Sequence, residues 1–108
     1  MTSAFALMAT KSASTKRLPA VSGGQGGAPQ LYLVDVPCLP LDPVDDVVRA
    51  RVASDAAHTV LETTIEGMYD VCRGDVLVYD GREYPIRECE RRQWQDEYTL
   101  AVRVEEMA

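Results

Sequence analysis

Few residues of this chain have the types and spacing that enzyme chemistry needs. A nucleophilic mechanism requires Ser, Cys or Thr beside a base, and the single histidine, His58, lies in an alternating β-strand pattern rather than in a loop. Three acid pairs could serve acid–base or metal chemistry: Asp45/Asp46, Glu88/Glu90 and Glu105/Glu106. Each pair falls where a solvated charged face or a terminus is expected, so we predict that the protein is not an enzyme.

Three cysteines, Cys38, Cys72 and Cys89, cannot all pair within one chain, and none belongs to a Cys-x-x-Cys pair. Their spacing indicates neither a disulfide framework nor a zinc site. We expect buried thiols that act as small apolar residues, a structural role for His58, and no metal or cofactor.

A glycine-rich segment, Ser22–Pro29, could in principle cradle a phosphate. That use requires a strand before the loop and a helix N-terminus after it. Here a β-branched and aromatic strand pattern, Leu31–Val36, follows instead. We expect a mobile loop in a hairpin whose first strand lies within residues 14–21.

Charge is distributed unevenly along the chain. Residues 1–34 carry +3, from Lys11, Lys16 and Arg17, whereas residues 35–108 carry −9, from eight arginines and seventeen acids. A protein that grips DNA normally presents a basic face to the phosphates. The acidic body therefore predicts weak contact with DNA at most.

A length of 108 residues suits a single domain. The apolar run near the start, Ala4–Ala9, is far shorter than the ~20 residues of a membrane-spanning helix, and no basic flank precedes it as in a secretory signal. We expect synthesis in the cytoplasm and no membrane association.

One helix is predicted over residues 42–53. Asp42 and Pro43 form a helix-start signal, and the valines that follow recur at helical spacing. Because valine is a poor helix former, this helix should pack its valine stripe against a sheet. Two other prolines bear on strands: Pro37 should end regular pairing of the strand before it, and Pro85 suggests an edge strand or a bulge.

Strand patterns fill the rest of the chain. Period-2 alternation predicts a strand over residues 57–65, and Asp80-Gly81 separates two further strands, residues 75–79 and 82–89. Asp-Gly is a strong hairpin signal because both central residues of a type I′ turn need positive φ. With the final strand, Tyr98–Val104, about six strands and one helix predict a mainly β fold, a small antiparallel barrel or sandwich.

The segment Glu90–Glu97 is expected to be a charged connector before the last strand. Its Arg91, Arg92 and Trp94 have the composition of a contact patch, since Trp and Arg dominate binding hot spots. The alternative is a Trp folded back over the barrel end with the arginines solvated.

The order of these pieces resembles the head–tail joining family of tailed bacteriophages, to which the head-completion (stopper) proteins of the neck belong. The resemblance covers residues 14–106 and rests on the order and length of its pieces. They are Tyr32–Cys38, a central Arg-containing segment, His58–Val60, Gly74–Val78, Asp80–Ile86 and Leu100–Glu106.

This resemblance implies a β-barrel with one helix that assembles as a homo-oligomeric ring below the portal and adaptor proteins. The ring would close the DNA-filled head by plugging, with no bond chemistry, and offer tail or tail-terminator proteins their attachment surface. The location implied is the virion neck, after synthesis in the host bacterial cytoplasm. Packaged DNA would lie nearby without sequence-specific binding, and an acidic lumen would let it slide.

Other readings stay open. Within the same setting the chain could be another neck or tail ring protein, such as an adaptor or a tail terminator. From a different class, it could be a free-standing β-barrel module that binds a ligand or peptide.

Residues 1–13 depart from the family pattern and are expected to form a flexible N-terminal arm, with residues 14–108 as the barrel domain. The candidate intersubunit contacts follow from the two unusual regions. They are Arg91, Arg92 and Trp94 of the connector, and the basic residues Lys11, Lys16 and Arg17.

Overall fold

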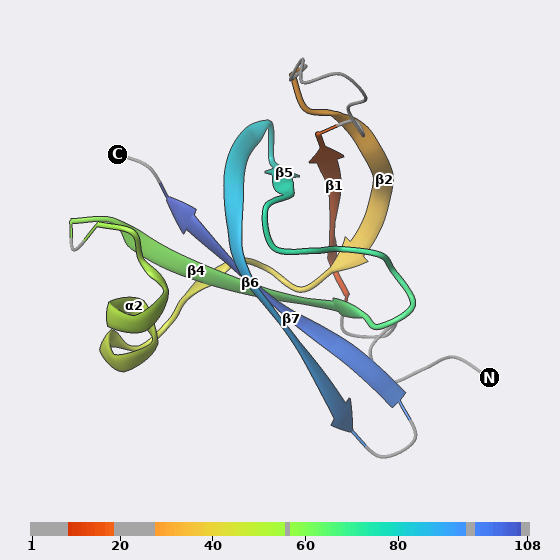
Figure 1. Cartoon of the computed structure of the whole chain (residues 1–108). Coiled ribbons are helices and arrows are strands. Elements are labelled where there is room, and N and C mark those ends of the chain that lie inside the picture. Colours follow the sequence, from red (N-terminus) through yellow and green to blue (C-terminus); the bar gives the residue numbers. More distant parts are fainter. Residues whose placement is uncertain (1–8, 19–27, 56, 95–96, 107–108) are drawn as a thin grey trace.

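A computed structural model describes residues 9–18, 28–55, 57–94 and 97–106. These residues form seven strands of one antiparallel sheet and one short helix (Figure 1). In chain order they are β1 (Lys11–Arg17), β2 (Gln30–Cys38), β3 (Asp42–Pro43), α2 (Asp46–Val52), β4 (Thr59–Glu66), β5 (Val76–Tyr79), β6 (Arg82–Trp94) and β7 (Glu97–Glu106). The mainly β fold with one helix is thus confirmed.

The sheet closes into a small barrel. Its strand order is β2-β1-β5-β6-β7-β4-β3, and β2 pairs in addition with β4. The closing contact is short: Cys38 pairs with Ile65, and the N–H of Leu39 donates to the carbonyl of Thr64 at 3.1 Å. From residue 30 to residue 37, no described strand pairs with the side of β2 that faces away from β1.

The hydrophobic core lies inside this ring. Strands alternate side chains between two faces, and β7 places Leu100, Val102 and Val104 inward, as the alternation predicted. The other buried core residues come from the remaining strands and the turn before β5. They are Ala13, Val36, Cys38, Ile65, Val71, Leu77, Tyr79, Tyr84 and Ile86.

The β5–β6 hairpin forms at the predicted turn. Asp80 and Gly81 have φ values of 50° and 76°, and Tyr79 pairs with Arg82 across them. Positive φ at both central residues is what a type I′ turn requires.

The β1–β2 hairpin also forms as predicted, but its first strand begins earlier. β1 starts at Lys11, and Ala13 is buried in the core. The boundary of the predicted arm at residue 13 is therefore wrong, because residues 11–13 pair with the Cys38 end of β2. Residues 1–8 of that arm and most of the glycine-rich loop lie outside the described residues.

β2 does not end at Pro37, which pairs with Ser12. Proline is tolerated there because that position has β1 as its one described neighbour. Two register shifts in the β1–β2 ladder, with Asp35 at a φ of 54°, mark bulges that bend β2 around the barrel.

The predicted helix is shorter and begins later than expected. Asp42 and Pro43 form β3 against β4, and the N–H of Val44 donates to the carbonyl of Val60, so the backbone up to this point belongs to the sheet. The N-cap is Asp45, whose carboxylate accepts from the N–H of Val48 at 2.9 Å. The expected valine stripe packs only in part: Val44, Val48 and Val52 are partly buried, Val47 is exposed, and no residue of α2 is fully buried.

The connector predicted over residues 90–97 is also wrong. β6 continues to Trp94 and β7 begins at Glu97, so this segment is the outer part of a long hairpin. Its charged side chains alternate along a strand that pairs with β7. Pro85 pairs with Val76 of β5, and β7 pairs with β6 only from Ile86 onward, next to a bulge between Ile86 and Glu88, so Pro85 lies where one strand neighbour is present and beside a bulge, as expected.

Replacing Gly81 by Val should destabilise the fold by ~1 kcal/mol or more, because a β-branched side chain resists positive φ. A Cβ at this position has no atom within 4 Å, so the cost is one of backbone conformation. Urea unfolding of Gly81→Val and Gly81→Asn would measure it. Asn tolerates this region better, so equal stability of wild type and both variants would contradict the turn.

Candidate functional site

β7 is buried on both of its faces, which is unusual for a strand of a small barrel. Its inward side chains are apolar, whereas its outward positions include Arg103 and Glu105, which are 4% and 0% exposed. Charged residues are almost never fully buried unless they are paired. The outer face of β4, β6 and β7 must therefore supply their partners.

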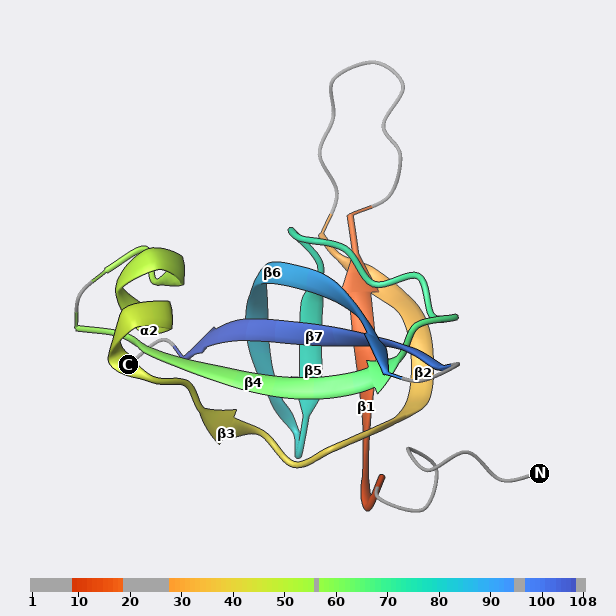
Figure 2. The ribbon, with the colours of Figure 1, turned by 90° about the horizontal axis from the view of Figure 1, so that it is seen from below.

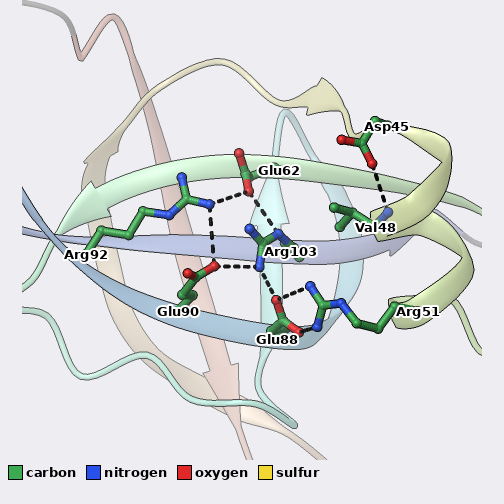
Figure 3. Close-up of polar contacts among 8 residues, drawn as sticks. All are labelled: Asp45, Val48, Arg51, Glu62, Glu88, Glu90, Arg92 and Arg103. Atoms are coloured by element: carbon green, nitrogen blue, oxygen red, sulfur yellow. Dashed lines mark hydrogen bonds and ion pairs between the residues drawn. The ribbon is translucent and has the colours of Figure 1, made fainter.

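Arg103 lies at the centre of a charged cluster on this face (Figure 3). In the ladder it stands directly between Glu62 of β4 and Glu88 of β6. Its Nε donates to Glu62 Oε1 at 2.9 Å, and its Nη1 lies 3.0 Å from Glu90 Oε2 and also contacts Glu88. Three carboxylates thus compensate one buried guanidinium.

Two further arginines complete the cluster. Arg51 of α2 contacts the carboxylate of Glu88 through both terminal nitrogens, one of them at 3.1 Å. Arg92 of β6 lies 3.4 Å from Glu90 and 3.7 Å from Glu62. We term these six residues the outer-face cluster: Arg51, Glu62, Glu88, Glu90, Arg92 and Arg103.

The charges of the outer-face cluster compensate one another. Hydrogen bonds from Arg51 and Arg103 lower the pKa of Glu88 against the effect of its burial, and a hydrogen bond from Arg103, with the nearby charge of Arg92, lowers the pKa of Glu90. Three arginines face three glutamates, so the cluster carries no net charge at neutral pH. Its glutamates are occupied by arginine rather than free to bind a cation.

A second polar cluster surrounds Glu105, near the C-terminal end of β7. The N–H and hydroxyl of Ser54 donate to its carboxylate at 3.2 and 2.8 Å, and Nε of Arg87 donates at 2.7 Å. The Nδ1 atom of His58 contacts the same carboxylate. Burial raises the pKa of Glu105, but these hydrogen bonds outweigh it and lower the pKa to about 2.

Ser54, His58 and Glu105 have the residue types of a nucleophilic triad but a different arrangement. In a triad the serine hydroxyl bonds to the imidazole, which the acid orients from its other side. Here Ser54 and His58 both bond to the carboxylate of Glu105. This geometry holds the loop between α2 and β4 against the barrel and does not activate Ser54. Within the described ranges, no three His, Cys, Asp or Glu side chains are grouped to hold a metal ion.

The two arginines predicted as contacts on the β6–β7 hairpin do not share a face. Arg91 and Arg92 are neighbours in β6 and point to opposite faces. Both are exposed, and Arg92 belongs to the outer-face cluster. The backbone of Trp94 pairs with Glu97 at the hairpin end, and its side chain lies outside the described part. An intersubunit role for these residues stays a prediction.

The three basic residues near the N-terminus lie in β1 rather than in an arm, and each faces an acid of the barrel. Their ion pairs are Lys11–Asp80 at 3.9 Å, Lys16–Glu83 at 2.7 Å and Arg17–Asp75 at 2.8 Å. These contacts place the basic residues on the barrel wall. A contact with neighbouring subunits remains a prediction for them too.

Arg17 has the most extensive contacts of the three. Its Nε and Nη2 donate to the two carboxylate oxygens of the buried Asp75, and its Nη1 donates to Asp70 at 2.9 Å. Asp70 also accepts from the hydroxyl of Tyr32 at 2.8 Å. Hydrogen bonds from Arg17 and Tyr32 lower the pKa of Asp70 to about 2. This group fastens the end of β1 to the turn before β5.

The three thiols differ in how deeply they are buried. Cys38 is fully buried in the core as expected, and Cys89 is partly buried against it. Cys72 is exposed, contrary to the expectation, because its neighbour Val71 takes the core position in the turn.

Sequence reasoning missed the buried charges, although a signal was present. Period-2 alternation places Glu62 on the opposite face from Leu61, Thr63 and Ile65, and Arg103 on the opposite face from Val102 and Val104. Opposite charges at outward positions of strands favour a cross-strand pair. The pairing of β4 with β7, which the sequence did not reveal, was the missing step.

No family model and no curated protein matches this chain. Among the described residues, no helix has the length and apolar character to cross a membrane.

Replacing Arg103 by Met should destabilise the fold by about 3 kcal/mol, because it removes one partner of a buried charge network and leaves the other charges uncompensated. Denaturant unfolding of Arg103→Met would measure this loss. The matched variant Arg91→Met alters an exposed arginine of β6 and should change stability by about 0.5 kcal/mol or less. Equal effects of the two changes would contradict the central role of Arg103.

The Glu105 cluster predicts a specific acid sensitivity. A carboxylate whose pKa is about 2 in the folded protein, below its value of about 4.3 in an unfolded chain, contributes stability that is present above about pH 5 and is lost as the pH falls toward 2. Glu105→Gln should reduce both the stability at pH 7 and its loss on acidification. Ser54→Ala, which removes one hydrogen bond, should shift that loss to higher pH. Melting temperatures from pH 7 to pH 2 test this, and superimposable wild-type and Glu105→Gln curves would refute it.

Proposed function

We propose that this chain is a structural protein of the tailed-phage neck. It forms a ring below the portal and adaptor, closes the DNA-filled head and provides the tail attachment surface. The observation that carries the proposal is the architecture: the chain folds as a small closed antiparallel barrel with one short helix, which is the fold that the sequence resemblance implies.

The charge distribution supports a role close to DNA without tight DNA binding. The whole chain carries a net charge of −6, and its basic residues in β1 are engaged by acids of the same barrel. The arginines of the outer-face cluster are likewise occupied by glutamates. A ring of such subunits repels phosphates, so packaged DNA passes its lumen without sticking.

The proposed role is structural assembly rather than catalysis. The ionisable groups with the most extensive contacts, Arg103, Glu105 and Arg17, hold strands and turns together. No cofactor enters the proposal. The mechanism is assembly, in which one patch of a subunit meets a different patch of the next copy, as a closed ring requires.

A triple variant, Arg91→Ala, Arg92→Ala and Trp94→Ala, tests the predicted contacts on the hairpin. We expect a folded monomer that fails to join the neck, so that filled heads leak DNA or lack tails. Electron microscopy and DNA-retention assays of particles assembled with the variant measure both defects. Arg73→Ala with Arg82→Ala, two exposed arginines elsewhere, is the matched control and should give normal particles.

Two different outcomes distinguish a wrong assignment of the hairpin contacts from a wrong assignment of the function. If the triple variant gives tailed, filled particles, the assignment of the hairpin contacts fails. If particles that lack this protein altogether retain DNA and carry tails, the neck function fails with it.

A further inference from the structure

Residues 68–73 lead from β4 toward β5 and pass alongside β2, as the green-to-teal trace in Figure 2 shows. We term this segment the strap. Backbone hydrogen bonds fix the residues at its two ends. The N–H of Gly67 donates to the carbonyl of Tyr98 at 2.8 Å, and the N–H of Gly74 donates to the carbonyl of Ile86 at 3.1 Å. The strap is therefore anchored on β7 at one end and on β6 at the other.

Between these anchors the strap has few contacts with the strands. Its own backbone hydrogen bonds are local, such as the one from the N–H of Val71 to the carbonyl of Tyr69 at 3.1 Å. Of its six residues, Val71 alone is buried, and Tyr69 is partly buried against the core. Among the described residues, no backbone hydrogen bond joins the strap to β2, whose edge is unpaired from residue 30 to residue 37.

Among the described residues, Asp70 supplies the polar side-chain contact of the strap with β1 and β2. Its carboxylate accepts from the hydroxyl of Tyr32 at 2.8 Å and from Nη1 of Arg17 at 2.9 Å. Arg17 is held independently by Asp75, which lies beyond the strap. Loss of the Asp70 carboxylate therefore releases the strap without releasing Arg17 from its other partner.

The residues that flank the strap suit hinges. Gly74 has a φ of 97°, a conformation that other residues rarely adopt. At Gly67 a Cβ atom would lie 2.9 Å from the Cβ of Tyr98, so the close approach of the two chains requires glycine. Residues at the ends of elements absorb the backbone rotation when a segment moves, and segments with few buried contacts open locally. We propose that the strap opens about Gly67 and Gly74 while the rest of the barrel stays folded.

Opening of the strap leaves the unpaired edge of β2 accessible to another strand. The strap is a device of the single subunit, so the inference goes beyond the proposed role in the neck and does not depend on it.

The thiol of Cys89 reports the opening. Cys89 packs against the core, and burial raises the pKa of its thiol to about 11, with smaller increases from the nearby Cys72, Asp75 and Glu88. It thus lies close to Cys72 of the strap. Cys38 is 0% exposed and stands in the closing pair of the barrel, so its thiol is exposed when the barrel itself unfolds.

Alkylation of the native protein by iodoacetamide tests the inference, with peptide mass spectrometry to measure the rate at each cysteine. In wild type, Cys89 should react more slowly than the exposed Cys72. Its rate should not change at low urea concentrations, because opening of a short segment exposes little surface. Cys38 should react through global unfolding and accelerate with urea.

Asp70→Ala should raise the labelling rate of Cys89 at least about tenfold, because it removes charge-assisted hydrogen bonds that hold the strap closed. Tyr32→Phe removes one of these bonds and should give a smaller increase, which provides a second test if Asp70→Ala does not fold. The matched control Glu83→Ala removes the ion pair with Lys16 of β1, away from the strap, and should change the rate by less than about twofold.

Two results would overturn this inference. In the first, Cys89 labelling in wild type follows that of Cys38 across the urea series, which means that global unfolding exposes both thiols. In the second, Asp70→Ala and Tyr32→Phe leave the labelling rate of Cys89 unchanged while circular dichroism shows that both variants are folded.

Discussion

The charge of Arg103, buried in the middle of β7, constrains the whole outer layer of the barrel. A buried guanidinium is tolerated only when carboxylates compensate it, and Glu62 and Glu88 stand opposite it on the two neighbouring strands. A one-residue slip of either pairing would turn a glutamate into the core and an apolar residue outward. The same contacts that neutralise Arg103 therefore fix the register of β4, β7 and β6, and with it the position of the apolar core.

The helix depends on this layer too. No side chain of α2 is fully buried, although Val48 and Val52 are partly buried, so polar contacts add to a limited apolar packing in holding the helix on the barrel. Arg51 ties it to Glu88, and Ser54, just beyond it, is bonded to Glu105. Both anchors are carboxylates whose pKa values are lowered by these contacts. We therefore expect α2 and the loop after it to be the first part of the barrel to loosen in acid.

Local patterns in the sequence predicted much of this fold. The Asp80-Gly81 turn, the alternation of β4 and β7 and the β1–β2 hairpin depend on neighbouring residues, and all three are confirmed. The helix start failed because Asp42 and Pro43 satisfy a helix rule locally, yet β4 offers them a strand partner from 20 residues away. The connector failed for a related reason: charged residues in β6 resemble a loop until the opposite charges of β7 are placed beside them. The outer-face cluster depends on strand order, which no local pattern contains.

On one side of the barrel, charged side chains form ion pairs within the subunit. On another side, apolar side chains are exposed to solvent. α2 lies on the first side, and the β1–β2 hairpin lies on the opposite side (Figure 2), where Leu31, Tyr32 and Val34 are exposed. Such a division suits the proposed ring subunit, whose own register must be set before neighbouring copies bind. The most direct measurement is electron cryo-microscopy of a tailed phage particle that contains this chain. The account predicts a ring of these barrels between portal and tail, and a neck with no density for the chain would contradict it.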